Sequence, residues 1–487
     1  MTIKIWWHNW LCHEKRGVNK LVFSSLTFLY FFLPIVLLLY FIVPMKVKNV
    51  IILISGLLFY AWGEPIYIVV MIISSSIDYV AGRLLHKFDD KKKLRLVLLL
   101  VSLSMNLGIL AVFKYSSFLI GNVNGIFGTS FIDPKLPLPI GISFYTFQSM
   151  SYTIDMYMRK IKVQKSLLNF MSYVSLFPQI VAGPIVRYED VQNEMETRTI
   201  NTTKVAEGIG MFVKGLAKKV ILANNIGLIW TAVRVMDFNT ISTATAWIGI
   251  LAFTFQIYFD FSGYSDMAVG LGKMLGFNFP QNFNYPYIAK SISEFWRRWH
   301  ITLGSWFRSY VYIPMGGNRK GLPKTIRNLV VVWMLTGLWH GASWNFILWG
   351  LYFGVLIILE RLFLGKLLEK MPGFISRAYA FILVVFGWVL FEITDLGQAF
   401  SYFKAMFGGT GVVIDSASKY LLETNLIIFA ICIIASTQII KKLYEKISSL
   451  KGNVIQYVMP VIQFATMIVC TAYLVDATYN PFLYFRF

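Results

Sequence analysis

Residues able to do chemistry concentrate in one stretch of this chain, Glu294 to Trp349, which holds two of its five histidines. The stretch begins EFWRRWHITLGSWFRSYVYIPMGGNRKG and ends in the apolar run NLVVVWMLTGLWHGASWNFILWG. The two histidines are His300 and His340. His340 lies within an apolar run of spanning length, where an ionisable side chain is costly and normally faces a protein interior or a wet cavity. We therefore expect His340 to face the inside of a helical bundle.

An imidazole in that position is suited to general-base catalysis. A neutral imidazole can accept the proton of a hydroxyl near pH 7 as that hydroxyl attacks a carbonyl carbon. The oxyanion that forms needs hydrogen-bond donors, and the nearest candidates in sequence are Trp339, Ser343 and Asn345. Taken alone, the position of His340 also fits a histidine packed and hydrogen-bonded between helices.

Arginines accompany the second histidine. Arg297 and Arg298 lie within one helical turn of His300, which places this histidine at a rim near an aqueous face. His300 is interpreted as catalytic, with a structural or substrate-positioning role as the alternative. The same stretch carries three further cations, Arg308, Arg319 and Lys320. These cations could attract the phosphates of a donor or anchor the cytoplasmic boundary of the membrane, and both interpretations stay open.

Two carboxylates follow a predicted span in the segment FDFSGYSDMAVGLGKMLGFNFPQNFNYPY. They are Asp260 and Asp266. Near a membrane boundary they could be catalytic, but we favour a structural role because acids in lipid-embedded folds usually pair. Arg297 or Arg298 could serve as the partner.

The composition is that of a polytopic membrane protein. Hydrophobic residues make up 57% of the chain, charged residues only 14%, and the mean hydropathy is +0.62. The net charge of +21 is clustered between apolar runs, as expected for short cytoplasmic loops facing anionic lipid. Nucleic-acid binding is disfavoured because no basic aromatic module is visible.

Apolar runs predict an all-α membrane bundle of about twelve spans. The runs are Val22–Pro44, Val50–Trp62, Ile66–Gly82, Leu96–Leu119, Ile140–Tyr157, Phe212–Val233, Ala244–Phe261, the run that contains His340, Phe346–Leu362, Ala380–Phe391, Leu426–Ile440 and Val454–Val475. The basic links Arg83–Arg95 and Lys441–Lys451 should be cytoplasmic, and both termini should then lie outside. Phe177–Asp190 contains two prolines and a glycine, so it is interpreted as a broken or re-entrant element shielded by protein, with a surface loop as the alternative.

The first twenty residues differ from the rest, and we treat residues 21–487 as one membrane-embedded domain. His8, Cys12 and His13 could form a metal site, but an interfacial segment is the favoured interpretation of residues 1–20. The three cysteines, Cys12, Cys432 and Cys470, show no CxxC spacing, so no disulfide framework or zinc site is predicted. We expect no bound metal and no bound cofactor.

The long motifs carry a resemblance. The stretch around His300 and His340, together with GLLFYAWGEP, LPIGISFYTFQSMSYTIDMY, FPQIVAGPIVRY and YNPFLYFRF, resembles the membrane-bound O-acyltransferase family, and within it the bacterial polysaccharide O-acetyltransferases. The resemblance implies a helical bundle with a cytoplasmic and an extracellular funnel, His340 in the narrow neck and His300 nearby. Relatives start near Leu21, so residues 1–20 could be an extraneous start.

This resemblance predicts an integral O-acyltransferase of the bacterial plasma membrane, most simply an acetyltransferase acting on cell-envelope or exported polysaccharide. The donor would be a cytosolic thioester, either acetyl-coenzyme A or an acyl carrier protein. The acceptor would be an extracytoplasmic partner acyltransferase that resembles SGNH hydrolases. The rival within the class is D-alanyl transfer to teichoic acid, and the rival outside it is a transporter of an acylated substrate, disfavoured because no internal repeat is visible.

Overall fold

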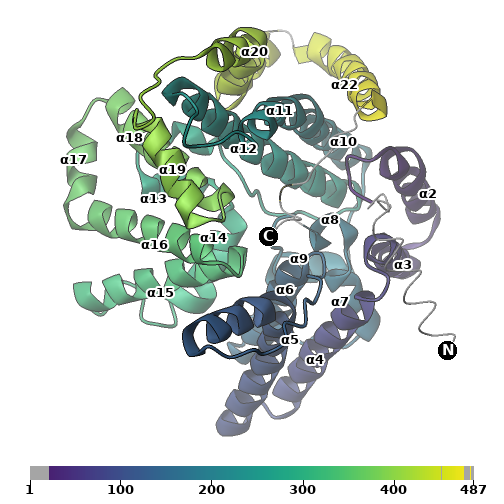
Figure 1. The fold of residues 1–487 in the computed structure, drawn as a ribbon. Helices are drawn as coiled ribbons and strands as arrows, with labels where there is room; N and C mark the ends of the chain where they lie inside the picture. The colour runs from purple at the N-terminus through teal and green to yellow at the C-terminus, as the bar shows by residue number, and fades with distance from the viewer. Residues whose placement is uncertain (1–20, 182, 451, 477–482, 484–487) are drawn as a thin grey trace, which may run out of the picture.

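The computed structural model describes residues 21–181, 183–450, 452–476 and 483. The described residues form helices and no strand, which confirms the predicted all-α class. Residues 1–20, with the proposed metal ligands and interfacial segment, lie outside them. The helices wrap around a common interior, with α20 (Ser416–Ala435) and α22 (Gly452–Asp476) at the periphery (Figure 1).

The N-terminal part is a group of antiparallel helices. After the π-helical turn Phe28–Phe32 it contains α2 (Leu33–Ile42), α3 (Met45–Gly63), α4 (Ile68–Lys87), α5 (Lys92–Phe127), α6 (Ile142–Tyr157) and α7 (Leu167–Val174). The runs Val50–Trp62 and Ile66–Gly82 form separate helices as predicted, because α3 ends at Gly63 and α4 begins at Ile68.

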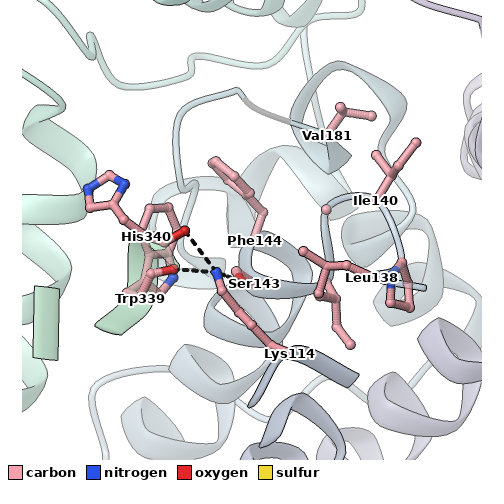
Figure 2. Close-up of a pocket in the computed structure, with 11 residues that line it drawn as sticks. Lys114, Leu138, Ile140, Ser143, Phe144, Val181, Trp339 and His340 are labelled. Atoms are coloured by element: carbon pink, nitrogen blue, oxygen red, sulfur yellow. Dashed lines mark hydrogen bonds between the residues drawn. The ribbon is translucent and has the colours of Figure 1, made fainter. Parts of the chain in front are cut away.

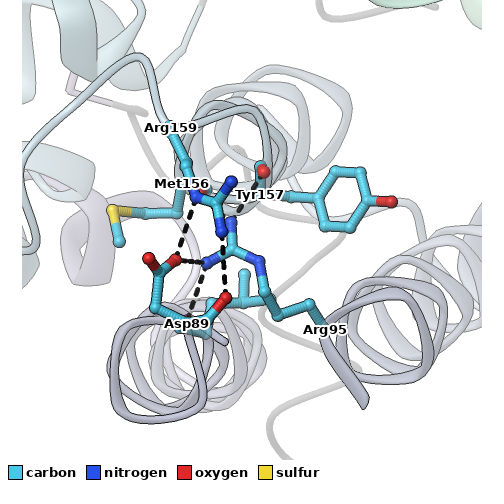
Figure 3. Close-up of polar contacts among 6 residues, drawn as sticks. Asp89, Arg95, Met156, Tyr157 and Arg159 are labelled. Atoms are coloured by element: carbon cyan, nitrogen blue, oxygen red, sulfur yellow. Dashed lines mark hydrogen bonds and ion pairs between the residues drawn. The ribbon is translucent and has the colours of Figure 1, made fainter. Parts of the chain in front are cut away.

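The ends of α4, α5 and α6 are joined by a buried guanidinium (Figure 3). Arg95, which is 4% exposed, donates to Leu85 O at 3.0 Å, to Met156 O at 3.0 Å and to Tyr157 O at 2.7 Å. It also pairs with Asp89, whose carboxylate accepts from Arg159 Nε at 3.1 Å. Arg95 thereby satisfies the last carbonyls of α4 and α6, which have no partner within their own helices.

The predicted break after α7 is present. Only a short helix, α8 (Phe177–Ile180), forms before α9 (Tyr188–Glu196), and the side chains of α8 are fully enclosed by protein. Gly183 is required here, because a Cβ at this position would lie 2.8 Å from Pro178 O. The interpretation as a shielded broken element is therefore confirmed, and a surface loop is excluded.

A close helix crossing forms the centre of the bundle. One continuous helical segment comprises α10 (Thr202–Ala217), a π-helical turn and α11 (Asn224–Val233), and it packs against α12 (Thr243–Met274). Glycines allow the backbones to meet: a Cβ on Gly208 would lie 2.6 Å from Gly270 O, and one on Gly215 would lie 2.5 Å from Gly263 O. Small residues at such a crossing are the usual way in which membrane helices approach closely.

The C-terminal half carries the predicted chemistry. Its helices are α13 (Ile292–Arg298), α14 (Ile301–Phe307), α15 (Leu322–His340), α16 (Trp344–Leu359), α17 (Gly365–Lys370), α18 (Gly373–Glu392), α19 (Leu396–Met406), α20, α21 (Ile439–Leu450) and α22. In Figure 1, α15 and α16 lie side by side, with α18 beside α16, and α19 packs on α18.

Nine helices of the described chain are long and apolar enough to cross a membrane, and Phe28–Ile42 is a shorter apolar helix. Their burial differs widely: 78% of the apolar window of α12 is buried within the protein, against 6% for the window in α22. α12 is thus an internal helix, whereas α22 offers nearly all its apolar surface to the surroundings. The helices α6 and α15 occur at expected spans but do not meet this criterion.

Candidate active site

His340 is the last residue of α15, and its side chain is enclosed by aromatic rings. The helix ends because Gly341 adopts an extended conformation, with φ −167° and ψ 157°. His340 is 4% exposed, and its ring centroid lies 5.0 Å from Trp339, 4.9 Å from Trp349 and 5.3 Å from Phe391. All three rings are close to perpendicular to the imidazole, so they fix its plane.

His300 begins α14 in an unusual backbone conformation. Its φ of 44° and ψ of 52° lie in the left-handed region, which costs a non-glycine residue on the order of 1–3 kcal/mol. The side chain is 2% exposed, which corrects the expectation of a rim near an aqueous face. The chain reverses here between α13 and α14 and turns the histidine inward, while Arg297 remains at the surface.

One amide sets the tautomer of His300. His300 Nδ1 lies 3.1 Å from Asn282 Oδ1, and the same oxygen accepts from the backbone N–H of Thr302 at 3.2 Å. Because a backbone N–H can only donate, the shared Asn282 atom must be the oxygen and His300 Nδ1 must carry a proton. In the neutral ring the basic nitrogen of His300 is therefore Nε2.

The structure brings the two histidines together around Trp339. The Trp339 indole lies 5.8 Å from the His300 ring and 5.0 Å from the His340 ring. Phe144 of α6 packs on both Trp339, at 5.3 Å, and His300, at 6.4 Å. The resulting group of His300, His340 and Trp339 is buried, and it joins α6, α14 and α15 at the candidate active site.

The three predicted oxyanion donors have different surroundings. Within the part of the chain that the structure describes, the buried Nε1 of Trp339 makes no hydrogen bond, so this donor is available to a ligand. The amide of Asn345 donates to Leu390 O at 3.1 Å and to Phe391 O at 3.2 Å at the end of α18. Ser343 precedes α16 and is partly exposed. The amide of Asn345 thus positions α18, whose Phe391 packs on His340.

The predicted donor-binding cations separate into two kinds. Arg298 forms an ion pair with Glu294 at 2.8 Å and also donates to Asn284 O at 3.1 Å. The other four are exposed and form no ion pair with a carboxylate among the described residues: Arg297, Arg308, Arg319 and Lys320. These four keep their charge available to an anion outside the protein.

The carboxylates pair with lysines and not with the predicted arginines. Asp260 lies 2.6 Å from Lys219 and accepts from the backbone N–H of Leu483 at 2.9 Å. Asp266 lies 2.8 Å from Lys218. Both acids are inside α12, which continues well beyond the predicted span, so the register of α12 against α10 and α11 decides their partners. The expected pairing was wrong, whereas the structural role is supported.

Sequence reasoning missed a lysine beside the histidine. Lys114 of α5 contacts the end of α15, and it lines a cavity of about 30 Å³ with Ser143, Trp339 and His340 (Figure 2). A cavity of this size holds one or two water molecules. The sequence did contain a sign of this lysine's importance, because Lys114 is a charged residue within the apolar run Leu96–Leu119.

Comparisons with known proteins identify the family. The model of MBOAT, the membrane-bound O-acyltransferase family, matches residues 157–394. The probable alginate O-acetylase of Azotobacter vinelandii is 40% identical over 391 residues, which cover 80% of this chain and 78% of that protein. The peptidoglycan O-acetyltransferase of Helicobacter pylori is 34% identical over 446 residues, 83% of each chain. The chain belongs to the membrane-bound O-acyltransferase family.

The family match encloses the candidate active site. Residues 157–394 include His300, His340 and all the predicted donor-binding residues, whereas Lys114 lies outside. A more distant relative, the teichoic acid D-alanyltransferase of Bacillus subtilis, is 30% identical over 52% of this chain and 68% of that protein. This protein is therefore a multi-pass membrane O-acyltransferase, and none of these matches supports the transporter alternative.

Proposed function

We propose that this O-acyltransferase transfers acetyl groups in the O-acetylation of a cell-envelope or exported polysaccharide, with His340 as the general base. The observation that carries the proposal is the packing of both histidines on the buried indole of Trp339. Two relatives at 34–40% identity, an alginate and a peptidoglycan O-acetylating protein, support the acetyl group and the polymer class.

In the proposed step, His340 accepts the proton of the acceptor hydroxyl as its oxygen attacks the carbonyl carbon of a thioester. The C–S bond then breaks, the acyl group remains on the oxygen, and the proton on His340 passes to the departing thiolate. The N–H of Trp339 supplies a donor for the oxyanion. His300, with its proton on Nδ1, offers Nε2 as a second basic nitrogen against the same indole.

The proposed donor is a cytosolic thioester, acetyl-coenzyme A or an acyl carrier protein, and no bound cofactor is required. Exposed cations support this assignment, because Arg297 and Arg308 can meet phosphates while Arg298 is held by Glu294. The acyl group would pass to the outer side, to a hydroxyl of an extracytoplasmic partner acyltransferase that resembles SGNH hydrolases.

D-alanyl transfer is the second candidate within the family. It is favoured only by the more distant match, at 30% identity over about half of this chain. The matches to O-acetylating proteins extend over 80% or more of the chain, so the acetyl assignment has the broader support.

The His340→Ala variant tests the proposal. Membrane vesicles are prepared from cells that carry the variant as their sole copy, acetyl-coenzyme A labelled in its acetyl group is supplied at the cytoplasmic face, and alkali-labile label is counted in the polysaccharide fraction. Loss of a general base should lower kcat ~100-fold to ~10,000-fold. The donor concentration at half-maximal rate should change little, because the proposed contacts to the donor's phosphates are made by exposed cations and not by the imidazole.

His86→Ala is the matched control. His86 is an exposed histidine near the end of α4, far in sequence from the stretch that carries the site. It should transfer at the native rate, and the amount of each variant in the membrane should match the native protein. Near-native transfer by a well-folded His340→Ala protein would rule out His340 as the base.

A further inference from the structure

Lys114 places its ammonium at the C-terminal end of α15. Its Nζ donates to Trp339 O, to His340 O at 3.3 Å and to Ser143 Oγ at 3.2 Å (Figure 2). An ammonium has three N–H donors, and three acceptors meet it here. An ionisable residue within a membrane helix is costly and is retained where it has partners, which this geometry supplies.

The next residue of α5 extends the contact. Tyr115 donates its hydroxyl to Leu338 O at 2.6 Å, so two consecutive residues of α5 bind the carbonyls of the last three residues of α15. These carbonyls have no partner further along their own helix and carry the negative end of its dipole. A lysine satisfies both the hydrogen bonds and the charge.

The contact acts on the backbone of His340 and not on its ring. In Figure 2 the imidazole of His340 points away from Lys114, on the far side of the backbone carbonyl that receives the hydrogen bond. Because the helix stops at Gly341, no further helical turn holds this residue in place. The last turn of α15 packs on α16, and the bonds from α5 hold its terminal carbonyls, including the backbone that carries the imidazole.

We propose that Lys114 is a positioning residue for acyl transfer: its ammonium fixes the end of α15 and thereby the imidazole of His340. The inference rests on the proposed role of His340. Misplacing a catalytic group by about 1 Å can cost about 100-fold in rate, so loss of this contact should appear in kcat. Lys114 lies outside the residues matched by the family model, whereas His340 lies inside them.

The experiment is a double-mutant cycle in the vesicle assay with labelled acetyl-coenzyme A. Lys114→Met should lower kcat ~10-fold to ~100-fold, leave the half-saturating donor concentration unchanged, and reach the membrane in normal amount. Lys114→Arg, which keeps a cation with several donors, should recover part of the rate. In a His340→Ala background, Lys114→Met should cost less than about twofold more, because residues that act through one another are not additive.

A purely structural role for Lys114 predicts a different pattern. Full additivity of the two losses, or a native rate for Lys114→Met, would overturn the positioning role. Near-native activity of the single His340→Ala variant would instead reject the proposed base, and the positioning role with it.

A second pair of variants covers poor folding of Lys114→Met. Tyr115→Phe removes one bond to α15 and should lower kcat, whereas Tyr352→Phe removes a comparable bond, from Tyr352 to Leu383 O at 2.8 Å, and should leave kcat unchanged. Equal rates for these two tyrosine variants would count against the proposal.

Discussion

At the scale of single residues, Asn282 is the group on which the second histidine depends. Its side-chain oxygen accepts from His300 Nδ1 at 3.1 Å, from Thr302 N at 3.2 Å and from Thr302 Oγ1 at 2.9 Å. Its backbone carbonyl accepts from Ile301 N at 3.0 Å. These bonds hold the left-handed backbone of His300, which has no intrinsic preference for that conformation.

Replacing Asn282 by Ala should lower both stability and rate. Buried donors left without an acceptor cost about 1–3 kcal/mol each, and the strained backbone at His300 would lose its support. Thermal unfolding of the purified protein in detergent should begin at a lower temperature, and kcat should fall. Asn284→Ala, at an exposed neighbour, is the matched control. Identical unfolding of both variants would contradict this role of Asn282.

At the scale of elements, the sequence located the helices well but did not predict which side chains of neighbouring helices form ion pairs. Apolar runs located the helices, and prolines with a glycine located the break around α8. The length of α12 was underestimated because its polar motif, with Asp260 and Asp266, resembled a loop. Glycines of that motif instead pack on α10, and the lysines that pair with the acids are reached only once the two helices are in register.

The Arg95–Asp89 contact that joins α4, α5 and α6 leads to a prediction about the pH dependence of stability. The hydrogen bond from Arg159 holds the pKa of the Asp89 carboxyl below its ordinary 3.8. A carboxyl with a depressed pKa stabilises the fold above its unfolded-state pKa, and that contribution is lost as the pH falls through the folded-state value. Asp89→Asn should therefore unfold at a lower temperature than the native protein at pH 7, and the difference should vanish well below pH 3.8.

The exposed neighbour Asp90 provides the control for the Asp89→Asn variant. Asp90→Asn removes the same charge from the same turn but breaks no ion pair within the described part of the chain, so its unfolding temperature should follow that of the native protein at every pH. The measurement is thermal unfolding in detergent across the acidic range. A difference between Asp89→Asn and the native protein that grows as the pH falls would contradict the assigned direction.

At the scale of the whole molecule, the site joins residues that are distant in sequence. The meeting of His300 and His340 was expected from the family resemblance, because composition and spacing do not define a contact across forty residues. Lys114 and His340 are separated by 226 residues, and only the folded structure reveals their contact. The rule that singled out His340, an ionisable group in an apolar run, applies equally to Lys114.

Membrane orientation is the remaining prediction for the whole molecule. Excess positive charge marks cytoplasmic links, so Lys91 before α5 and Lys446 in α21 should face the cytoplasm, and Lys135 after α5 should face outward. All three side chains are exposed.

Single cysteines at these positions, with Cys12 replaced by Ser and the buried Cys432 and Cys470 retained, can be treated with an impermeant thiol reagent. In intact cells only the cysteine at Lys135 should react, whereas those at Lys91 and Lys446 should react only in inside-out vesicles. In that orientation α5 runs outward from Lys92. Lys114 and the end of α15 then lie toward the outer side of the membrane, where the proposed acceptor is located. Labelling of Lys91 and Lys446 cysteines in intact cells would reverse this orientation and place the end of α15 on the cytoplasmic side.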